Sequence, residues 1–441
     1  MTMVPSRRSL RRLRRSPLAS PRQWLRQVVF WLGAVLVSLA AIGFASLADR
    51  ASNAFAAVVA WQPLLALAIA PAGLALSVLL TRRVFPGAQG SGIPQVIASM
   101  HIHDPATVAR VLSLRIALGK ILLTLVGLLC GASIGREGPT VQVGASLMQA
   151  LGKTLRLPRM QAQRALVLAG GAAGVSAAFN TPLAGVVFAI EELSHSFEAR
   201  TSGTVLTAVI ISGVATLALV GNYSYFGTSA AQFDIGAAWL AVGLCGVAGG
   251  ALGGLFSAAL VRAAGGIGGV AGRFVLRHPL LFAAVCGLAL AGLGLVSSGA
   301  TYGTGYAQAR GLVEGRGDLP ASFFLLKLAA TTVSYLSGIP GGIFAPSLAI
   351  GAGLGHSLSG LMPSSPAGAI VLLGMVGYFA GVVQAPLTAT VIVLEMTENQ
   401  RMTIPLMATA MLAFGVSRLI CRRPLYGALA RRFLAAVEAR P

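Results

Sequence analysis

The chain has 441 residues, of which 56% are hydrophobic and only 10% are charged. Soluble domains usually carry about 25% charged residues, so this chain cannot cover the surfaces of the roughly three soluble domains that its length would otherwise make. A polytopic helical membrane protein remains. The formal net charge of +21 indicates basic residues kept in cytoplasmic loops, rather than a surface for nucleic acid. The four cysteines are scattered and predict neither a disulfide framework nor a zinc site.

Apolar runs supply the candidate membrane spans, since a spanning helix needs about 20 apolar residues. In chain order they are Val28–Leu47, Ala54–Leu80, Ile121–Ile134, Ala165–Ile190, Thr201–Val220, Ile235–Val261, Pro279–Ser298 and Phe323–Leu336. The stretch Leu328–Leu394 has no charged residue at all, and it is cut by Gly and Pro. It is too long for one helix, so we expect several short or broken helices there, buried against protein rather than lipid.

Charge placement predicts the orientation in the membrane. Basic residues gather in five segments, which we interpret as cytoplasmic: Arg7–Arg26, Arg82–Arg83, Lys153–Arg164, Arg262–Arg277 and Arg418–Arg432. The segment Asn222–Asp234 has no basic residue and is predicted to lie outside. The two halves then begin on opposite sides of the membrane. A cleaved signal peptide is the alternative for the N-terminus, but Val28–Leu47 is longer than the usual apolar region of roughly 7–15 residues.

An internal repeat agrees with inverted topology. Leu168, Gly170, Pro182, Leu183, Val187 and Glu191 recur 204 residues later as Leu372, Gly374, Pro386, Leu387, Val391 and Glu395. At a spacing of 207, Gly135, Pro139, Gly144 and Ala145 match Gly342, Pro346, Gly351 and Ala352. Inverted repeats are typical of transporters, whose binding site lies at the midplane between the halves.

The predicted fold is therefore all-α, a polytopic membrane protein with two inverted-topology repeats of tilted and broken helices. We expect a basic cytoplasmic segment over 1–27, a first membrane repeat over 28–220, an external linker over 221–234, a second membrane repeat over 235–420 and a C-terminal helix on the cytoplasmic side over 421–441. Both termini are then cytoplasmic.

Three Gly-rich breaks indicate an anion site. They are Gly90–Pro94, Gly135–Pro139 and Gly338–Pro346, and each places Gly before Pro ahead of an apolar stretch. Pro favours the first turn of a helix, and Gly allows a tight turn before it. Each break therefore predicts a helix N-terminus at membrane depth, where free N–H groups and the helix dipole attract an anion without a full positive charge. The alternative is a set of kinks that serve helix packing.

These three segments, in this order and spacing, resemble the signature motifs of the CLC family of chloride channels and chloride/proton antiporters. The resemblance runs from about Val28 to Tyr426 and is closest to prokaryotic members without C-terminal regulatory domains. It implies a chloride/proton antiporter that is a homodimer in the cell inner membrane, with no cofactor, no metal and no enzymatic activity.

The resemblance also implies roles for single residues. Ser91 and Tyr426 would supply hydroxyls to a central chloride, and the backbone N–H groups of Ile343 and Phe344 would complete that site. An outer chloride site would use backbone N–H groups around Arg136–Gly138 and Phe344–Ala345. Glu137 would be the gate that competes with chloride, and Glu192 would be the inner proton-transfer residue.

The acidic residues support part of this assignment independently. Glu137, Glu191, Glu192 and Glu395 lie inside or at the ends of apolar runs, where a carboxylate is costly and marks a functional candidate. Glu191 has a repeat partner in Glu395, which predicts a shared structural task. Glu192 faces Met396 in the repeat, so we assign the proton relay to Glu192. The alternative for Glu192 is a charge at a helix end that faces the cytoplasm.

Simpler structural roles remain open for the other candidates. Ser91 can be an ordinary N-cap, and Tyr426 can be an interfacial anchor. Arg136 either adds positive potential at the outer mouth or extends to the surface. Lys120 either tunes the pathway or pairs with a buried acid. Gln95 stands where the family commonly has Glu, and we expect no effect on the anion site.

Three other functions compete with antiport. A passive chloride channel of the same fold is disfavoured by Glu192, because the family's channels generally lack an acid there. The fluoride-exporting branch is disfavoured by Ser91 in the first motif. A membrane enzyme would rest on His101, His103 and Asp104 as metal ligands, with no Cys or Glu-rich partner nearby.

Overall fold

Helices make up nearly all of the regular structure in the computed structural model, which describes residues 21–154, 160–194, 199–221, 224–229, 231, 239–266, 268–317, 319–362 and 365–439. Within these ranges there is no strand, only two isolated β-bridges. The predicted basic segment before residue 21 and much of the predicted external linker, including Asp234, lie outside the described residues.

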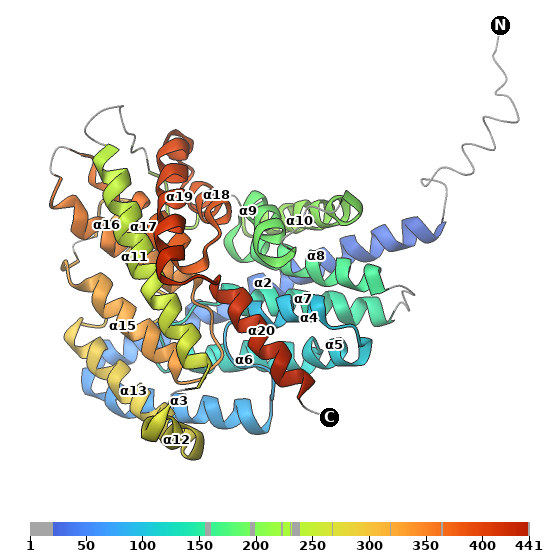
Figure 1. Cartoon of the computed structure of the whole chain (residues 1–441), viewed down its shortest axis with the longest axis horizontal. Coiled ribbons are helices and arrows are strands. Elements are labelled where there is room, and N and C mark those ends of the chain that lie inside the picture. Colours follow the sequence, from blue (N-terminus) through green and yellow to red (C-terminus); the bar gives the residue numbers. More distant parts are fainter. Residues whose placement is uncertain are drawn as a thin grey trace, which may run out of the picture.

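Figure 1 shows the helices in chain order. Up to residue 220 they are α2 (Pro21–Trp61), α3 (Ala66–Arg83), α4 (Ile93–His101), α5 (Pro105–Val111), α6 (Leu114–Leu129), α7 (Glu137–Thr154), α8 (Met160–Phe179), α9 (Pro182–Phe188) and α10 (Ala199–Val220). After it come α11 (Trp239–Ala264), α12 (Gly269–Arg277), α13 (Pro279–Val296), α14 (Tyr306–Val313), α15 (Phe323–Leu336), α16 (Phe344–Ser359), α17 (Ala367–Val383), α18 (Pro386–Thr397), α19 (Thr403–Ile420) and α20 (Leu425–Glu438).

Six helical segments of the described chain are long and apolar enough to cross a bilayer. They are Gln27–Trp61, Pro63–Arg83, Pro105–Leu129, Trp239–Ala264, Pro279–Val296 and Gln400–Ile420. The uncharged stretch from residue 328 to 394 is broken into the end of α15 and three further helices, α16 to α18, as the sequence predicts. The chain is a multi-pass membrane protein.

Two predicted spans have the wrong ends. The sequence suggested a break between Val28–Leu47 and Ala54–Leu80, but α2 continues through Asp49 and Arg50 to Trp61. No Gly or Pro lies between Ala45 and Trp61, so nothing stops the helix before Gln62, which precedes Pro63. Charged residues do not end a helix by themselves when their side chains can pair with another group or reach solvent.

The predicted single span Ala165–Ile190 is also wrong, because it is two helices. Asn180 adopts a left-handed conformation, φ 56°, between α8 and α9, and Pro182 opens α9. The same left-handed residue followed by Pro recurs in the second half, where Gln384 has φ 59° and Pro386 opens α18. A left-handed residue ends a helix and Pro begins the next one.

The two halves pack in the same way. Helix α7 lies against α8 as α16 lies against α17, and α2 contacts α8 and α10 as α11 contacts α17 and α19. Glycine permits the closest of these approaches: a Cβ on Gly144 would collide with the carbonyl oxygen of Gly170, and one on Gly351 would approach that of Gly374 to 2.6 Å. The sequence repeat thus coincides with repeated helix contacts.

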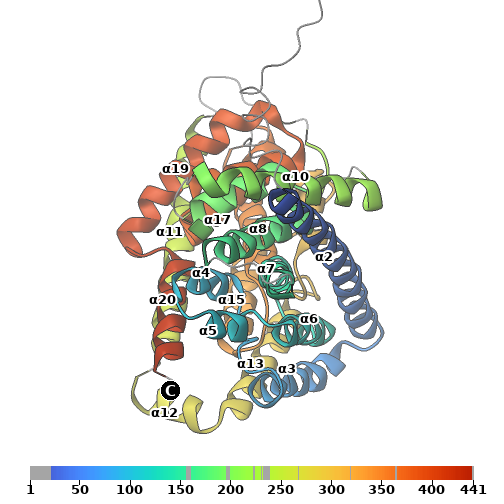
Figure 2. The ribbon, with the colours of Figure 1, turned by 90° about the vertical axis from the view of Figure 1, so that its right-hand side faces the viewer.

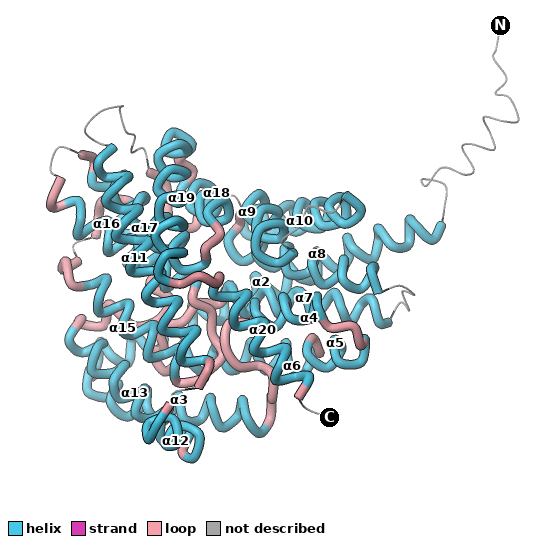
Figure 3. Tube along the Cα trace, viewed as in Figure 1, coloured by secondary structure: helices cyan, strands magenta, loops and turns pink. Residues whose placement is uncertain are grey.

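Irregular backbone lies in the interior of this bundle. The loops before α7 and α16 are buried, and Figure 3 shows loop segments running through the middle of the molecule between helices. The C-terminal helix α20 returns to pack against α4, and Figure 2 shows the two side by side. Buried non-helical backbone in a membrane protein marks a cavity or a binding site.

Candidate functional site: a buried anion pathway

The three Gly-rich breaks each open a helix, as predicted. Helix α4 begins at Ile93 after Gly92, whose φ is 100°. Helix α7 begins at Glu137, and α16 begins at Phe344. All three first turns are buried.

Backbone hydrogen bonds bring the three breaks together. Gly135 and Gly342 exchange two N–H···O bonds of 2.7 Å, and the N–H of Gly341 donates to the carbonyl of Gly90 at 3.1 Å. A Cβ on Gly138 would run into the Ser91 side chain, so α7 starts directly against the first break. Three positive helix ends therefore converge on one buried region, which favours an anion.

The predicted central chloride site has two buried hydroxyls. Ser91 and Tyr426 are 1% and 0% exposed, their side chains face each other, and neither hydroxyl makes a hydrogen bond of standard geometry to any residue that the structure describes. The N-cap of α4 is Gly92, without a side-chain cap bond, so the N-cap interpretation of Ser91 is wrong. The burial of Tyr426 likewise excludes an interfacial anchor. Buried polar groups normally find partners, so these two hydroxyls are available to a ligand.

Phe344 lies beside this region as an aromatic wall. Its ring centroid is 5.9 Å from that of Tyr426, 6.0 Å from Phe179 and 4.9 Å from Phe379. Ile343 and Phe344 are both buried, and Ile343 is the N-cap residue of α16. The N–H groups at such a helix start have no intrahelical acceptor.

Glu137 is folded into the protein rather than toward solvent. Its side chain is fully buried and lies back over Gly135, where an added Cβ would meet Oε2. The hydroxyl of Tyr225 donates to Oε1 at 3.4 Å, and the N–H groups of Glu137 itself and Ala345 also interact with the carboxylate. The carboxylate thus occupies the position where a helix-bound anion is expected.

Arg136 does not extend to the surface. Its Nη1 donates to the carbonyl of Ala45 at 2.5 Å and to Asp49 Oδ1 at 2.7 Å. Arg136 is 6% exposed, whereas the Asp49 side chain is 60% exposed. The pair fixes a positive charge beside Glu137, one residue from the start of α7.

Glu192 is buried too, at 2% exposure, so the interpretation as a solvent-facing helix end is wrong. It lies in a π-helical turn, Ala189–Ser194, an irregularity that is frequent at functional sites. Among the residues that the structure describes, none makes a hydrogen bond of standard geometry to Oε1 of Glu192. Glu192 and Glu137 both lie close enough to Tyr426 for their charges to act on it.

Glu191 and Glu395 share a structural task, as their repeat relation predicts. Glu191 accepts from the N–H groups of Leu387 and Thr388 at 3.2 and 2.6 Å. Glu395 accepts from those of Leu183 and Ala184 at 3.0 and 2.6 Å. Each carboxylate therefore caps the first turn of the helix in the other half.

Lys120 and Gln95 support the first break. Nζ of Lys120 donates to the carbonyls of Gln89 and Gly90 at 3.2 and 2.8 Å, so the alternative of a buried acid as its partner is wrong. Nε2 of Gln95 donates to Gln89 at 2.8 Å. Both side chains hold the backbone that leads into Ser91.

Asp104 has a structural role. Its carboxylate caps α5 through the N–H groups of Ala106 and Thr107, and the hydroxyl and N–H of Thr107 and the N–H of Ala106 hold the pKa of Asp104 below its usual value. Nδ1 of His101 lies 3.0 Å from the carbonyl of Ile97. Within the described residues, no three His, Cys, Asp or Glu side chains are grouped to hold a metal.

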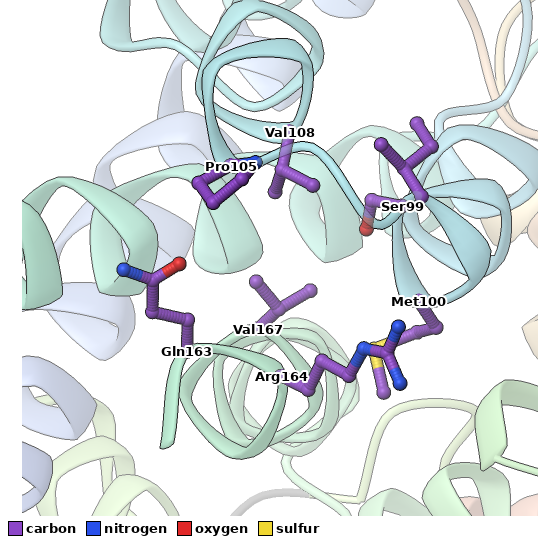
Figure 4. Close-up of a pocket in the computed structure, with 8 residues that line it drawn as sticks. Ser99, Met100, Pro105, Val108, Gln163, Arg164 and Val167 are labelled. Carbon is purple, nitrogen blue, oxygen red and sulfur yellow. The ribbon is translucent and has the colours of Figure 1, made fainter. Parts of the chain in front are cut away.

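A small pocket near α5 is separate from the anion region (Figure 4). Residues of α4, α5 and α8, together with Ile102 just after α4, line it: Ser99, Met100, Ile102, Pro105, Val108, Gln163, Arg164 and Val167. None of these lining residues is a predicted site residue, so we do not assign this pocket to the anion pathway.

Sequence reasoning missed two residues that lie beside Glu137 and Arg136. Asp49 could have been found, because it is one of only twelve acidic residues and follows directly after an apolar run. Tyr225 gave no signal, because its approach to Glu137 depends on how the segment after α10 folds back.

Comparison with known proteins identifies the family. The family model described as voltage gated chloride channel matches residues 72–418. The chain belongs to that family. The predicted resemblance to CLC proteins and the predicted fold class are confirmed. This is a transport family, and the alternative of a membrane enzyme has no support.

Relatives cover most of the chain. It is 35% identical over 379 residues to the H(+)/Cl(-) exchange transporter ClcA of Yersinia pestis bv. Antiqua (strain Angola), spanning 81% of this chain and 76% of that protein. The ClcA of Salmonella paratyphi A (strain ATCC 9150 / SARB42) is 32% identical, over 82% and 77%.

Solved structures share the architecture. A slow cyanobacterial Cl⁻/H⁺ antiporter superposes with a TM-score of 0.76 at 25% identity, covering 93% of this chain and 98% of that one. A CLC-type fluoride/proton antiporter has a TM-score of 0.78 at 22% identity with the same coverage. The latter likeness concerns the fold alone.

Proposed function

We propose that this protein exchanges chloride for protons across the membrane. The relatives that share most of its length are exchange transporters. The observation that carries the proposal is that the buried starts of α7 and α16 meet in one region, where Glu137 is also buried, and that a second buried acid, Glu192, lies near the same region.

Chloride binding would rest on dipoles and hydroxyls rather than on a full positive charge. Ser91 and Tyr426 offer O–H donors, and Ile343 and Phe344 offer backbone N–H groups at the start of α16. The N–H groups around Arg136–Gly138 and Ala345 offer a second, outer position. A site of this kind holds an anion and still releases it, because no ion pair has to be broken.

Glu137 couples the two ions through competition. Its carboxylate and chloride are both attracted to the same helix N-termini. Protonation removes the charge of the carboxylate, so the side chain leaves and chloride enters. The pathway is thereby opened by a proton without a large hinge motion.

Glu192 would deliver that proton from the other side. It is buried next to Glu191 and on the Tyr426 side of the site. A passive chloride channel is the second candidate, and it is disfavoured by the buried acid Glu192, because the family's channels generally lack an acid at this position. Simultaneous measurement of chloride and proton flux in proteoliposomes separates the two: antiport requires proton movement driven by a chloride gradient alone.

We also propose the membrane arrangement. The basic segments assign both termini to the cytoplasm of a bacterial inner membrane, with residues 221–234 outside as the linker between the repeats over 28–220 and 235–420. Glu137 and Tyr225 then lie toward the outside, and Glu192 lies toward the cytoplasm.

A homodimer is the proposed assembly, with one pathway in each subunit. The capped helices α9 and α18 expose Leu183 and Leu387, at 64% and 50%, at repeat-related positions. Exposed apolar side chains continue along α10 and α19, among them Val214 and Met411. A second copy would bury this face by a two-fold operation.

A further inference from the structure

The segment after α10 is anchored over the gate. The N–H of Phe226 donates to the carbonyl of Met396 at 3.0 Å, and that of Ser229 donates to Thr397 at 3.3 Å. Nδ2 of Asn399 donates to the carbonyl of Ala231 at 2.7 Å. These bonds hold the backbone of the described part of the linker against the end of α18 and the residues just after it.

Tyr225 is the side chain that this segment places on Glu137. It is 3% exposed, and its hydroxyl lies 3.4 Å from Glu137 Oε1. Its ring makes edge contacts with Phe179, Phe226 and Tyr306 at centroid distances of 5.7, 5.0 and 4.9 Å. The aromatic packing holds the ring, so the hydroxyl is aimed at the carboxylate.

We propose that Tyr225 is a positioning residue that holds the ionised Glu137 side chain in its closed position. This inference rests on the proposed function, because it assigns a role to the gate. A hydroxyl donates a stronger hydrogen bond to a carboxylate than to a neutral carboxyl group. Tyr225 therefore stabilises the charged, closed state and opposes both protonation and departure of the side chain.

The distance of 3.4 Å is longer than the usual 2.5–3.0 Å of an O–H···O bond, so the expected effect is modest. Tyr225→Phe keeps the ring contacts and removes only the donor. We expect chloride efflux from proteoliposomes to rise about two- to tenfold, the range for one hydrogen bond. The pH of half-maximal efflux should move upward, since an ionised carboxylate that has lost a donor is protonated at higher pH.

Tyr306→Phe is the matched control. Its ring packs against Tyr225, but its hydroxyl accepts from Arg310 at 3.0 Å rather than contacting Glu137. We expect Tyr306→Phe to leave both the rate and the pH profile within twofold of wild type. An equal effect of the two variants would overturn the proposal, because ring packing would then set the rate.

A second background isolates the contact. In Glu137→Ala there is no carboxylate to hold, so adding Tyr225→Phe should leave chloride efflux unchanged. The same increase in this background as in wild type would overturn the proposal, as would the absence of any change in the single variant. Efflux and its pH dependence are measured without reference to proton uptake. A wild-type protein lacking chloride-driven proton uptake would therefore contradict the proposed function alone.

Discussion

At the scale of single residues, the candidate site consists of buried polar groups. Glu137 and Glu192 are both buried and form no salt bridge with any described residue, whereas Arg136 is paired with Asp49. A buried carboxylate is costly unless it is satisfied or neutral, so both acids are places where a proton can be bound or released.

Replacing Glu192 by Gln is expected to abolish proton movement and to leave chloride flux. The amide has nearly the same shape but cannot carry a proton through a cycle. Chloride and proton flux in the same vesicles provide the measurement. Glu395→Gln serves as the control, because this acid caps α9 and should keep coupled exchange. Proton uptake driven by a chloride gradient in Glu192→Gln would remove Glu192 from the relay.

The two hydroxyls can be tested together with Ser91→Ala and Tyr426→Phe. Each neutral hydrogen bond contributes about 0.5–1.5 kcal/mol, so we expect chloride affinity to fall about two- to tenfold for each hydroxyl removed. The backbone N–H groups at Ile343 and Phe344 remain, so binding weakens but is not lost. Isothermal calorimetry with chloride gives the affinity, and an unchanged value for the double variant would exclude these hydroxyls.

Prediction from sequence worked at this scale where the motif itself fixes the geometry. Gly before Pro dictates a helix start, so the positions of Glu137 and Phe344 follow from local backbone chemistry. The side chains that contact the start of α7 cannot be predicted from the motif. Asp49 lies 87 residues before Arg136 and Tyr225 lies 88 residues after Glu137, and only the tertiary fold brings them together.

At the scale of elements, the hydrogen bonds that join the two repeats at α9 and α18 are made by helix ends rather than by helix interiors. Pro182 and Pro386 open α9 and α18 after left-handed residues, and the first turns of these helices lie against carboxylates from the other half. This cross-capping ties the repeats together at two points related by the same spacing of 204 residues.

Glu395→Ala tests the cap. The N–H groups of Leu183 and Ala184 lose their acceptor, so we expect a loss of about 0.5–2 kcal/mol in the free energy of unfolding, with coupled exchange retained. Glu398→Ala is the matched control, because Glu398 is an exposed acid at the C-terminal end of the same helix. Denaturant unfolding in detergent provides the comparison, and equal stability of the two variants would contradict the capping role.

Element boundaries show what periodicity and composition miss. Phe323–Leu336 is reproduced as α15, because polar and glycine residues flank the apolar run. The break placed within α2 was wrong because charged residues were read as a helix end. The short helices α5, α12 and α14 were not predicted, since seven to nine residues give too little periodicity and their stability comes from tertiary contacts.

At the scale of the whole molecule, the internal repeat is the feature from which most follows. The repeat can be detected in the sequence because Gly, Pro and Glu recur at fixed spacings. In the structure it coincides with repeated helix contacts. The two halves differ at the two acids to which we assign transport roles: Glu137 has Phe344 as its repeat partner, and Glu192 has Met396.

The proposed dimer predicts a particle in mild detergent with twice the 44.9 kDa mass of one chain. Light scattering with correction for detergent gives that mass. Leu183→Arg places a charge on the face we assign to the interface and should shift the population toward the single chain, whereas Leu276→Arg on α12, also exposed, should not. A monomeric wild-type particle at all concentrations would contradict the dimer.

The central claim is that Glu137 is the point where chloride and protons exchange, and Glu137→Gln tests it most directly. Proteoliposomes loaded with chloride are diluted into low chloride, and chloride efflux and proton uptake are recorded together. Gln cannot be ionised and therefore mimics the protonated, open gate permanently. We predict passive chloride efflux with little pH dependence and no proton uptake. Chloride-driven proton uptake at the wild-type ratio in Glu137→Gln would contradict the account.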